Sequence, residues 1–315
     1  MDNSVYGSTL QPFAGITTFM RQPATRELKD VDVAILGIPF DSATSYRSGT
    51  RFGPRKIREL SAMLWGSNQV LRVAPLDHLR VIDYGDVDVV PVDIHETFAR
   101  TTATVKTILD AGATVISLGG DHSLALPLLR AHHAKFGKLA VVHFDSHGDM
   151  WDYDFVGYKY SHGTPFRRAV EEDLIDTDAY LQIGIRGSTS ALDDYEMATN
   201  LGARIMTIRD AMAQGTEKIV ETIRQTVGTR PIYISFDIDA VDPAYAPGTG
   251  TPEVGGFTSF QALEMVRGLA GLNSVGFDLV EVDPSFDHGD ITSLLAANLV
   301  FEFLSLAALK KRAAQ

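Results

Sequence analysis

An α/β fold with a mainly parallel central sheet is the fold class that this sequence predicts. Short apolar segments alternate along the chain with longer segments of helical periodicity, which is the pattern of repeated β–α units. Several short segments are β-branched and apolar on both faces, as expected for strands covered by helices on both sides. We therefore expect a single three-layer α/β/α domain over residues 1–315, with residues 1–28 as an N-terminal extension that packs on it.

Each predicted strand is a short apolar run, and each predicted helix fills the interval before the next run. The strands are expected at residues 31–39, 114–118, 139–144, 180–184, 204–207, 232–238 and 274–280. The helices are expected at residues 54–64, 95–111, 123–136, 192–200, 216–227 and 259–269. Polar residues interrupt the last apolar stretch, 291–309, so we predict a buried C-terminal helix with Asp290 near its cap instead of a membrane span.

Composition narrows the possible functions. The chain has 315 residues, with 28 Lys and Arg against 40 Asp and Glu, a net charge of -12 and no Cys. This acidic balance argues against a general nucleic-acid binder. The lack of Cys excludes disulfides, thiolate nucleophiles and Cys-ligated metals, so a metal site must use His, Asp and Glu. The N-terminus has no basic start followed by an apolar run, and we expect a cytoplasmic protein that does not bind membranes.

Three clusters of acidic residues and His follow predicted strands. They are GGDHS at 119–123, DSHGD at 145–149 and DID at 237–239. Because alternate residues of an extended backbone point to one side, the side chains within each cluster are expected to converge. Ligands of open α/β sheets bind at the carboxyl ends of the strands, where these clusters lie. Six candidate metal ligands result: His122, Asp145, His147, Asp149, Asp237 and Asp239.

Charge counting indicates what this set would bind. Four carboxylates in one place repel one another unless cations lie between them, and two divalent cations balance four negative charges. We therefore predict a two-metal site with bridging carboxylates, suited to Mn²⁺ or a similar ion. Taken singly, each residue is better explained as a cap, a turn former or a core residue. His143 is expected to be structural, and Asp121 either orients a ligand or forms a turn.

The three clusters resemble the motifs of the ureohydrolases, the family of arginase, agmatinase, guanidinobutyrase and their relatives. GGDHS, FDSHGD and SFDIDAVDPAYAPGTGTPEVGG match in order and separation, from about Thr17 to the C-terminal helix. The six candidate ligands occupy the family's ligand positions. Ser146 stands where Ala is usual; it is small enough to be tolerated and can add a hydrogen bond. The resemblance implies an arginase-like fold, two Mn²⁺ ions with Ni²⁺ in unusual members, and a homotrimer or homohexamer.

The resemblance also assigns catalytic roles. His162 matches the His thought to shuttle protons, and Glu281 matches the Glu that holds the substrate guanidinium. A guanidinium carbon is a poor electrophile, so its hydrolysis needs water activated by the two metals, with Asp149 orienting it. Glu281 would present the carbon, and His162 would pass a proton to the leaving amine. The implied activity is that of an amidinohydrolase, which cleaves a C–N bond to give urea and an amine.

Looser motifs favour a subgroup of the family. GITTFMRQP, SHGTPFRRAVEEDLID and LQIGIRGS resemble segments of guanidinobutyrase- and guanidinopropionase-like enzymes. They imply an ω-guanidino acid substrate such as 4-guanidinobutyrate or 3-guanidinopropionate, with agmatine or another small guanidine compound as the alternative. Arg167, Arg168 and Arg186 are candidate anchors for a substrate carboxylate. In the loop at 150–162, Trp151 is hypothesised to narrow the pocket, and Tyr158 lies in the same loop.

Three competing interpretations are weaker. A non-catalytic subunit of a mixed oligomer should have degenerate ligands, whereas all six and Glu281 are present. A deacetylase-like amide hydrolase with one Zn²⁺ does not account for two-metal ligation or for the segment GTGTPEVGG. A nucleotide-binding protein would need a phosphate loop, and the glycines near residue 250 neither precede GK[ST] nor open a helix after a strand.

Overall fold

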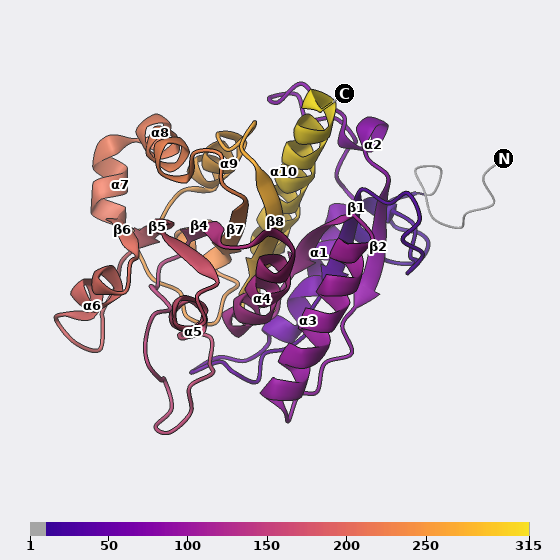
Figure 1. The fold of residues 1–315 in the computed structure, drawn as a ribbon. Coiled ribbons are helices and arrows are strands. Elements are labelled where there is room, and N and C mark those ends of the chain that lie inside the picture. The colour runs from indigo at the N-terminus through magenta and orange to yellow at the C-terminus, as the bar shows by residue number, and fades with distance from the viewer. Residues whose placement is uncertain (1–10, 315) are drawn as a thin grey trace.

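Eight parallel strands form one sheet in the computed structural model, which describes residues 11–314. Their order across the sheet is β2-β1-β3-β8-β7-β4-β5-β6 (Figure 1). The strands are β1 (Val33–Gly37), β2 (Val81–Asp86), β3 (Thr114–Leu118), β4 (Leu139–Phe144), β5 (Ile175–Ile185), β6 (Arg204–Thr207), β7 (Ile232–Asp237) and β8 (Ser274–Val280). Every pairing between neighbours is parallel, so the prediction of a mainly parallel α/β sheet is confirmed.

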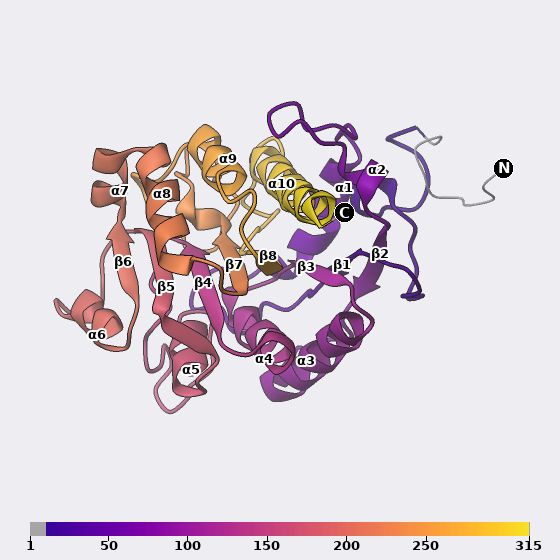
Figure 2. The same ribbon diagram turned by 45° about the horizontal axis from the view of Figure 1, so that its top comes forward.

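Helices cover both faces of the sheet, which explains why its central strands are apolar throughout. One layer holds α3 (Ile94–Asp110), α4 (Ala125–Phe136), α5 (Pro165–Glu171) and α6 (Asp194–Asn200) (Figure 2). The opposite layer holds α1 (Gly53–Ser61), α2 (Pro75–His78), α7 (Ile208–Gln214), α8 (Thr216–Val227), α9 (Ser259–Arg267) and α10 (Ile291–Ala313). The predicted three layers are therefore present.

Strand β2 was not predicted from the sequence because its residues, VIDYGD, are too polar for the expected pattern. In the structure, hydrogen bonds compensate the buried negative charge of Asp83 on this strand. The guanidinium of Arg58 donates two hydrogen bonds to the carboxylate of Asp83, at 2.8 and 2.9 Å. The backbone N–H of Phe19 donates to the same carboxylate at 2.8 Å. This contact fastens the described part of the predicted N-terminal extension to the sheet edge; residues 1–10 of that extension lie outside the described residues.

The C-terminal helix α10 is long and apolar enough to span a membrane by length and composition, but 78% of its most apolar stretch is buried inside the protein. It packs on β8, α9 and α1 as a core helix, as predicted. Asp290 lies at the N-cap position, with a left-handed φ of 63° and no capping hydrogen bond. Instead, the carboxylate of Asp287 accepts the backbone N–H groups of Thr292 and Ser293, each at 2.9 Å, and so caps the helix.

The carboxyl ends of the central strands define where a site can form. Strands β1, β3, β8, β7 and β4 are consecutive across the sheet. The segments that leave their carboxyl ends include 119–123, 145–149 and 237–239, which are the three clusters named from the sequence. Parallel strand direction thus brings segments more than a hundred residues apart in sequence to one edge.

Candidate metal centre

The first cluster is shaped by a close approach of two chain segments. The backbone N–H of Asp121 donates to the carbonyl of Phe40 at 2.8 Å. A Cβ on Gly120 would overlap that same carbonyl oxygen, so only glycine fits there. The Asp121 carboxylate then accepts the N–H of Ser123 at 3.0 Å and caps the short 3-10 turn His122–Leu124. Of the two roles open for Asp121, the structure supports the turn.

The other two clusters converge through turns, which corrects the expected geometry. Strand β4 ends at Phe144, and Asp149 has a left-handed φ of 51°, so residues 145–149 are not an extended segment. The Asp145 carboxylate accepts the N–H of His147 at 2.6 Å. In the third cluster, the Asp237 carboxylate accepts the N–H of Asp239 at 2.8 Å within a 3-10 turn. The short side chains thus hydrogen-bond their own backbone and fold the chain around the site.

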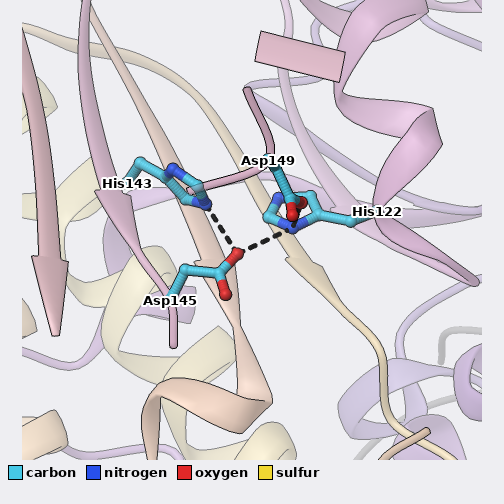
Figure 3. Close-up of side chains that lie close together, drawn as sticks. All are labelled: His122, His143, Asp145 and Asp149. Carbon is cyan, nitrogen blue, oxygen red and sulfur yellow. Dashed lines mark hydrogen bonds and ion pairs between the residues drawn. The ribbon is translucent and has the colours of Figure 1, made fainter. Parts of the chain in front are cut away.

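One group of candidate ligands surrounds His122. Its ring Nδ1 lies 3.0 Å from Oδ2 of Asp145, 3.0 Å from Oδ2 of Asp149 and 3.2 Å from Oδ2 of Asp237. Figure 3 shows the carboxylate of Asp145 lying between the rings of His122 and His143. The His122 side chain is only 1% exposed. These residues therefore gather carboxylate oxygens around one buried imidazole nitrogen.

A second group surrounds His147. Its Nδ1 lies 3.1 Å from Oδ2 of Asp239 and 3.6 Å from Oδ1 of Asp145. Asp145 therefore directs one oxygen to each group, as a carboxylate that bridges two cations would. The Ser146 hydroxyl donates to Oδ1 of Asp239 at 2.7 Å, so the hydrogen bond foreseen for this Ser is present. The His147 side chain is 20% exposed, and its ring faces a cavity.

The chemistry of the donors fits divalent cations. Nδ1 of His122 and Oδ2 of Asp239 are buried without a hydrogen-bond partner among the described residues, although oppositely charged atoms lie within about 3 Å. Burial and the nearby charge of Asp145 raise the pKa of Asp149 to about 7. Burial and the charge of Asp239 likewise raise the pKa of Asp237. Carboxylates that resist ionisation are stabilised by cations among their oxygens, so this His/Asp cluster fits a binuclear metal site.

His143 lies behind the first group. Its Nε2 is 2.7 Å from Oδ2 of Asp145, and its ring packs 4.0 Å from that of Phe166. Burial lowers the pKa of His143 to about 4, so the ring is neutral and can donate a hydrogen bond to Asp145. This contact supports the structural role predicted for His143, although its position also allows it to join a metal group.

Sequence reasoning missed a buried chain of hydrogen bonds that orients His122. Its Nε2 lies 2.9 Å from the hydroxyl of Ser235. That hydroxyl donates to Asp278 at 2.7 Å, and the hydroxyl of Tyr233 donates to the other oxygen of Asp278 at 2.7 Å. The alternation of Ser235 with Asp237 along β7 was an available signal, because it places both near the same edge. The contribution of Asp278 from β8 could come only from the strand order.

His162 and Glu281 lie together beside the cluster. Oε1 of Glu281 accepts the backbone N–H of His122 at 2.9 Å and lies 3.0 Å from Nδ1 of His162. Oε2 of Glu281 is buried and has no hydrogen-bond partner among the described residues. Burial lowers the pKa of His162, but the hydrogen bond and charge of Glu281 outweigh it and raise this pKa to about 9. Glu281 has a φ of 62°, a strained backbone of the kind found at functional sites.

A cavity of about 110 Å³ opens onto these groups. Its wall includes His147, Asp149, Asp237, His162 and Glu281, together with Ser45, Trp151 and Thr251. Trp151 and Ser45 also line an adjoining outer cavity of about 650 Å³, so both residues stand where the two spaces meet. The indole N–H of Trp151 donates to Asp194 at 3.3 Å. Tyr158 is exposed and lines neither cavity.

The three arginines named as carboxylate anchors do not face either cavity. Arg186 is buried and donates to backbone carbonyls, including those of Asp239 and Glu253 at 2.7 Å each. Arg168 donates to Asp152 at 2.8 Å, and Arg167 donates to Glu171 at 3.0 Å. All three are therefore held by protein groups, and the sequence pattern could not reveal these partners.

The fold and the site together define a class: an α/β protein with a buried His/Asp cluster at the carboxyl edge of a parallel sheet. Comparison with known proteins refines the class. The arginase family profile matches residues 31–305. The chain is 46% identical over 296 residues to the guanidinopropionase of Pseudomonas aeruginosa, covering 94% of this chain and 93% of that protein. It is 45% identical over 301 residues to the guanidinobutyrase of the same organism, covering 95% and 94%.

A solved structure agrees with these matches. The proclavaminate amidinohydrolase of Streptomyces clavuligerus superimposes with a TM-score of 0.91 and 41% identity, covering 95% of this chain and 99% of that one. The chain therefore belongs to the arginase family. The resemblance to ureohydrolases stated from three motifs is confirmed, and with it the class of hydrolases that act on guanidino C–N bonds.

Proposed function

We propose that this protein hydrolyses the guanidino group of a small ω-guanidino acid, such as 4-guanidinobutyrate or 3-guanidinopropionate, to urea and an amine. One observation carries the proposal. Oε2 of Glu281 is buried and unpartnered among the described residues, and Glu281 lines the cavity that also reaches His147 and Asp149. A planar cation that donates hydrogen bonds, such as a guanidinium, would satisfy this oxygen and place its carbon beside the cluster.

The six residues of the cluster would hold two divalent cations, with Asp145 lying between the two groups of residues. Carboxylate oxygens with two imidazoles suit Mn²⁺, and Ni²⁺ is compatible with the same donors. Two such cations supply an activated water and stabilise negative charge that develops on the substrate. A chelated preparation reloaded separately with each ion, and assayed for urea, would identify the metal.

Residues of the chain would orient the substrate and the water and would transfer the proton. Glu281 orients the guanidinium, and Asp149, which reaches the cavity, holds the attacking water in line with the carbon. His162 lies 3.0 Å from Glu281 and lines the cavity, so it can carry a proton between the water and the leaving amine. Its Nδ1–H remains directed at Glu281, which leaves Nε2 as the nitrogen that exchanges the proton.

The proposal that the substrate carries a carboxylate is supported by two relatives whose names refer to guanidino acids. In place of an arginine anchor, the outer cavity offers the hydroxyl of Ser188 and the backbone N–H groups of Ser188 and Thr189 to a carboxylate. The Thr189 hydroxyl already donates to the carbonyl of Ala191, and Ser190 donates to Asp194. One observation favours the alternative, agmatine. Asp154 and Asp194 line the same outer cavity and have no ion pair with Lys or Arg among the described residues, so their negative charge would attract a cationic tail.

The decisive experiment is urea release from a panel of guanidine compounds by enzyme loaded with Mn²⁺ or with Ni²⁺. The panel contains 4-guanidinobutyrate, 3-guanidinopropionate, guanidinoacetate, agmatine, arginine and free guanidine. A preference for an ω-guanidino acid supports the proposal. A preference for agmatine would replace the substrate but keep the reaction. No urea from any compound, with both cations bound, would overturn the amidinohydrolase assignment.

Trp151 is proposed to set the length of substrate that the inner cavity accepts. It stands between the two cavities and is held by Asp194. Trp151→Ala should shift the ratio of kcat/KM between four-carbon and three-carbon guanidino acids by about 10-fold, because one methylene in a pocket is worth 10–200-fold. Asp194→Asn, which keeps the size of the side chain, should shift the same ratio less. An unchanged ratio in Trp151→Ala would count against this role.

We further propose that the protein works in the cytoplasm as one domain per chain, in a homotrimer or homohexamer. This part rests on the resemblance to ureohydrolases alone. Light scattering coupled to size-exclusion chromatography measures the assembly. A monomer at micromolar concentration would contradict it.

A further inference from the structure

Ser45 contacts His162 through two atoms. The backbone N–H of Ser45 donates to Nε2 of His162 at 3.0 Å, and the Ser45 hydroxyl lies 2.8 Å from the same nitrogen. On the other side of the ring, Nδ1 of His162 lies 3.0 Å from Glu281. The ring is therefore held between a carboxylate and the loop that follows β1.

This loop is fixed independently of the ring. The backbone N–H of His162 donates to the carbonyl of Ala43 at 3.1 Å, and the N–H of Ala43 donates to the buried carboxylate of Asp121 at 3.0 Å. The Asp41 carboxylate accepts the N–H of Gly49 at 2.8 Å and so closes the loop. Ser45 is consequently placed by main-chain bonds, and it does not depend on its own contact with His162 to reach this position.

The two contacts assign the protons on the ring. A backbone N–H can only donate, so Nε2 of His162 must accept, and the ring proton of the neutral form lies on Nδ1, facing Glu281. The two partners act in opposite directions. Glu281 favours the charged ring, whereas the amide of Ser45 bonds only the neutral ring and so opposes lasting protonation at Nε2. A ring balanced in this way can take up and release a proton at Nε2.

The Ser45 hydroxyl lies on the path from Nε2 to the substrate. Ser45 lines both the inner cavity, with Glu281 and Asp149, and the outer cavity. Ser45 is exposed, whereas His162 is buried. A proton that leaves Nε2 therefore meets the hydroxyl of Ser45 before it meets a ligand in the cavity.

We propose that Ser45 is a proton-passing residue that connects His162 to the nitrogen of the leaving amine, an inference that rests on the proposed function. A proton of the attacking water first passes to Nε2 through the Ser45 hydroxyl. When the C–N bond breaks, its electron pair stays on the amine nitrogen and takes the hydroxyl proton of Ser45. The hydroxyl takes the proton of Nε2 in exchange, and His162 returns to its neutral form. The amine nitrogen thus gains one proton of the water and the carbon gains its hydroxyl. The protonated urea then gives up the second proton of the water, which the amine takes to leave as an ammonium ion.

The test compares Ser45→Ala, which keeps the backbone amide but removes the hydroxyl, with Ser45→Thr, which keeps both. Ser48→Ala is the matched control, since it removes an exposed hydroxyl from the same loop. Ser45→Ala should lower kcat by about 10–100-fold, toward the low end of general acid–base effects, with KM within about 3-fold. Ser45→Thr should recover most of this loss, and Ser48→Ala should match the wild type. Metal content and Tm are measured for each variant to show that it is folded and loaded.

Two further measurements separate proton transfer from a structural effect. Substrates with a guanidinooxy group release a weakly basic alkoxyamine, so Ser45→Ala should affect them much less than ordinary guanidino acids. The dependence of kcat/KM on the deuterium content of the solvent should be curved for the wild type, since two protons move together, and linear for Ser45→Ala. Equal losses for both leaving groups, or a rate within 2-fold of wild type, would overturn the role of Ser45 while leaving the proposed function intact.

The protonation of His162 can be read without turnover. In wild-type protein loaded with diamagnetic Zn²⁺ and held above pH 9, where the ring is neutral, the ¹⁵N chemical shifts should show an acceptor at Nε2 and a proton on Nδ1. A proton on Nε2 at that pH would contradict the assignment, whatever the activity. If the wild type releases no urea from any guanidine compound, the proposed function fails, and the chemical shifts still decide the contact between Ser45 and His162.

Discussion

The two ends of the His/Asp cluster differ in access. His122 is 1% exposed and has three carboxylate oxygens within 3.2 Å of its Nδ1, whereas His147 is 20% exposed, with one carboxylate oxygen at 3.1 Å and another at 3.6 Å. His122 is also oriented from behind by Ser235, while the His147 ring borders the cavity. We expect the buried end to retain a cation more strongly and the open end to contact substrate and solvent. A cation at the open end should therefore exchange first.

Removal of the shared carboxylate should have the largest effect. Asp145→Asn deprives both groups of a charged oxygen and should release both cations, with more than about 100-fold loss of metal affinity, since even residues that only support ligands cost 10–100-fold. Metal analysis after gel filtration measures the result. Retention of one full equivalent would mean that Asp145 serves a single cation and that the two ends are not linked through it.

Substitution at each end should separate the two cations. Under a chelator, the wild type should lose its cations in two phases, the faster one from the open end. His147→Asn should retain only the slow phase, and His122→Asn only the fast phase, with turnover strongly reduced in both. Stopped-flow chelation with a metal-sensitive dye resolves the phases. A single phase in the wild type, or the reverse assignment in the variants, would contradict the comparison.

The pH dependence of stability should report the crowded charges. In the folded metal-free protein Asp149 keeps its proton up to about pH 7, whereas the unfolded chain loses it near pH 4. The folded state therefore binds more protons across this window, and its free energy of unfolding falls as the pH rises from about 4 to 7. The raised pKa values of His122 and His147 act in the same direction above pH 6.5.

Cations reverse this trend because they bind the deprotonated groups. The increase in Tm on adding Mn²⁺ should be about 3 °C larger at pH 8 than at pH 5.5, which corresponds to roughly 2 kcal/mol for a chain of 315 residues. Thermal unfolding with and without metal measures it, and Asp145→Asn provides the control in which metal should add little at either pH. An increase that is independent of pH would show that the acidic groups are ionised before metal binds.

The smallest effect is expected from Ser146, which supports the open end alone. Ser146→Ala removes the hydroxyl that donates to Asp239 at 2.7 Å, a contribution of about 1 kcal/mol. The fast phase of metal loss should accelerate by about 5-fold, and the slow phase should not change. Ala is the usual residue of the family at this position, so activity should persist. A change in the slow phase would show that the two ends are coupled beyond Asp145.

Much of the site could be predicted because its residues occur in short, contiguous motifs. The six candidate ligands come in three clusters that each follow a strand, and the structure brings them together. The backbone geometry that was predicted for two of these clusters was wrong, however. An extended backbone was expected at 145–149 and 237–239, but Asp145 and Asp237 bend their own segments by accepting backbone N–H groups. Local hydrogen bonds of this kind compete with extended structure and are not visible in apolar periodicity.

Other features depend on contacts between distant segments. Ser45 lies more than a hundred residues from His162. Asp278 is connected to His122 through the hydroxyl of Ser235, and this is possible only because β8 lies between β3 and β7. The prediction that an arginine anchors the substrate failed for the same reason. The sequence does not show whether a guanidinium already donates to backbone carbonyls, as that of Arg186 does. Strand β2 was not predicted because Asp83 makes its segment look too polar for a strand. The charge of Asp83 is compensated by Arg58, which is distant in the sequence.

The sequence by itself determined the α/β class, the six donors and the expectation of a two-cation site, since apolar periodicity and charge are properties of neighbouring residues. Only the tertiary structure decided which oxygen of Asp145 faces which imidazole, that one end of the cluster is buried and the other open, and that Ser45 meets His162. The physical reason is that parallel strands align the ends of segments far apart in the chain, and the strand order that selects the neighbours is set by packing of the whole sheet.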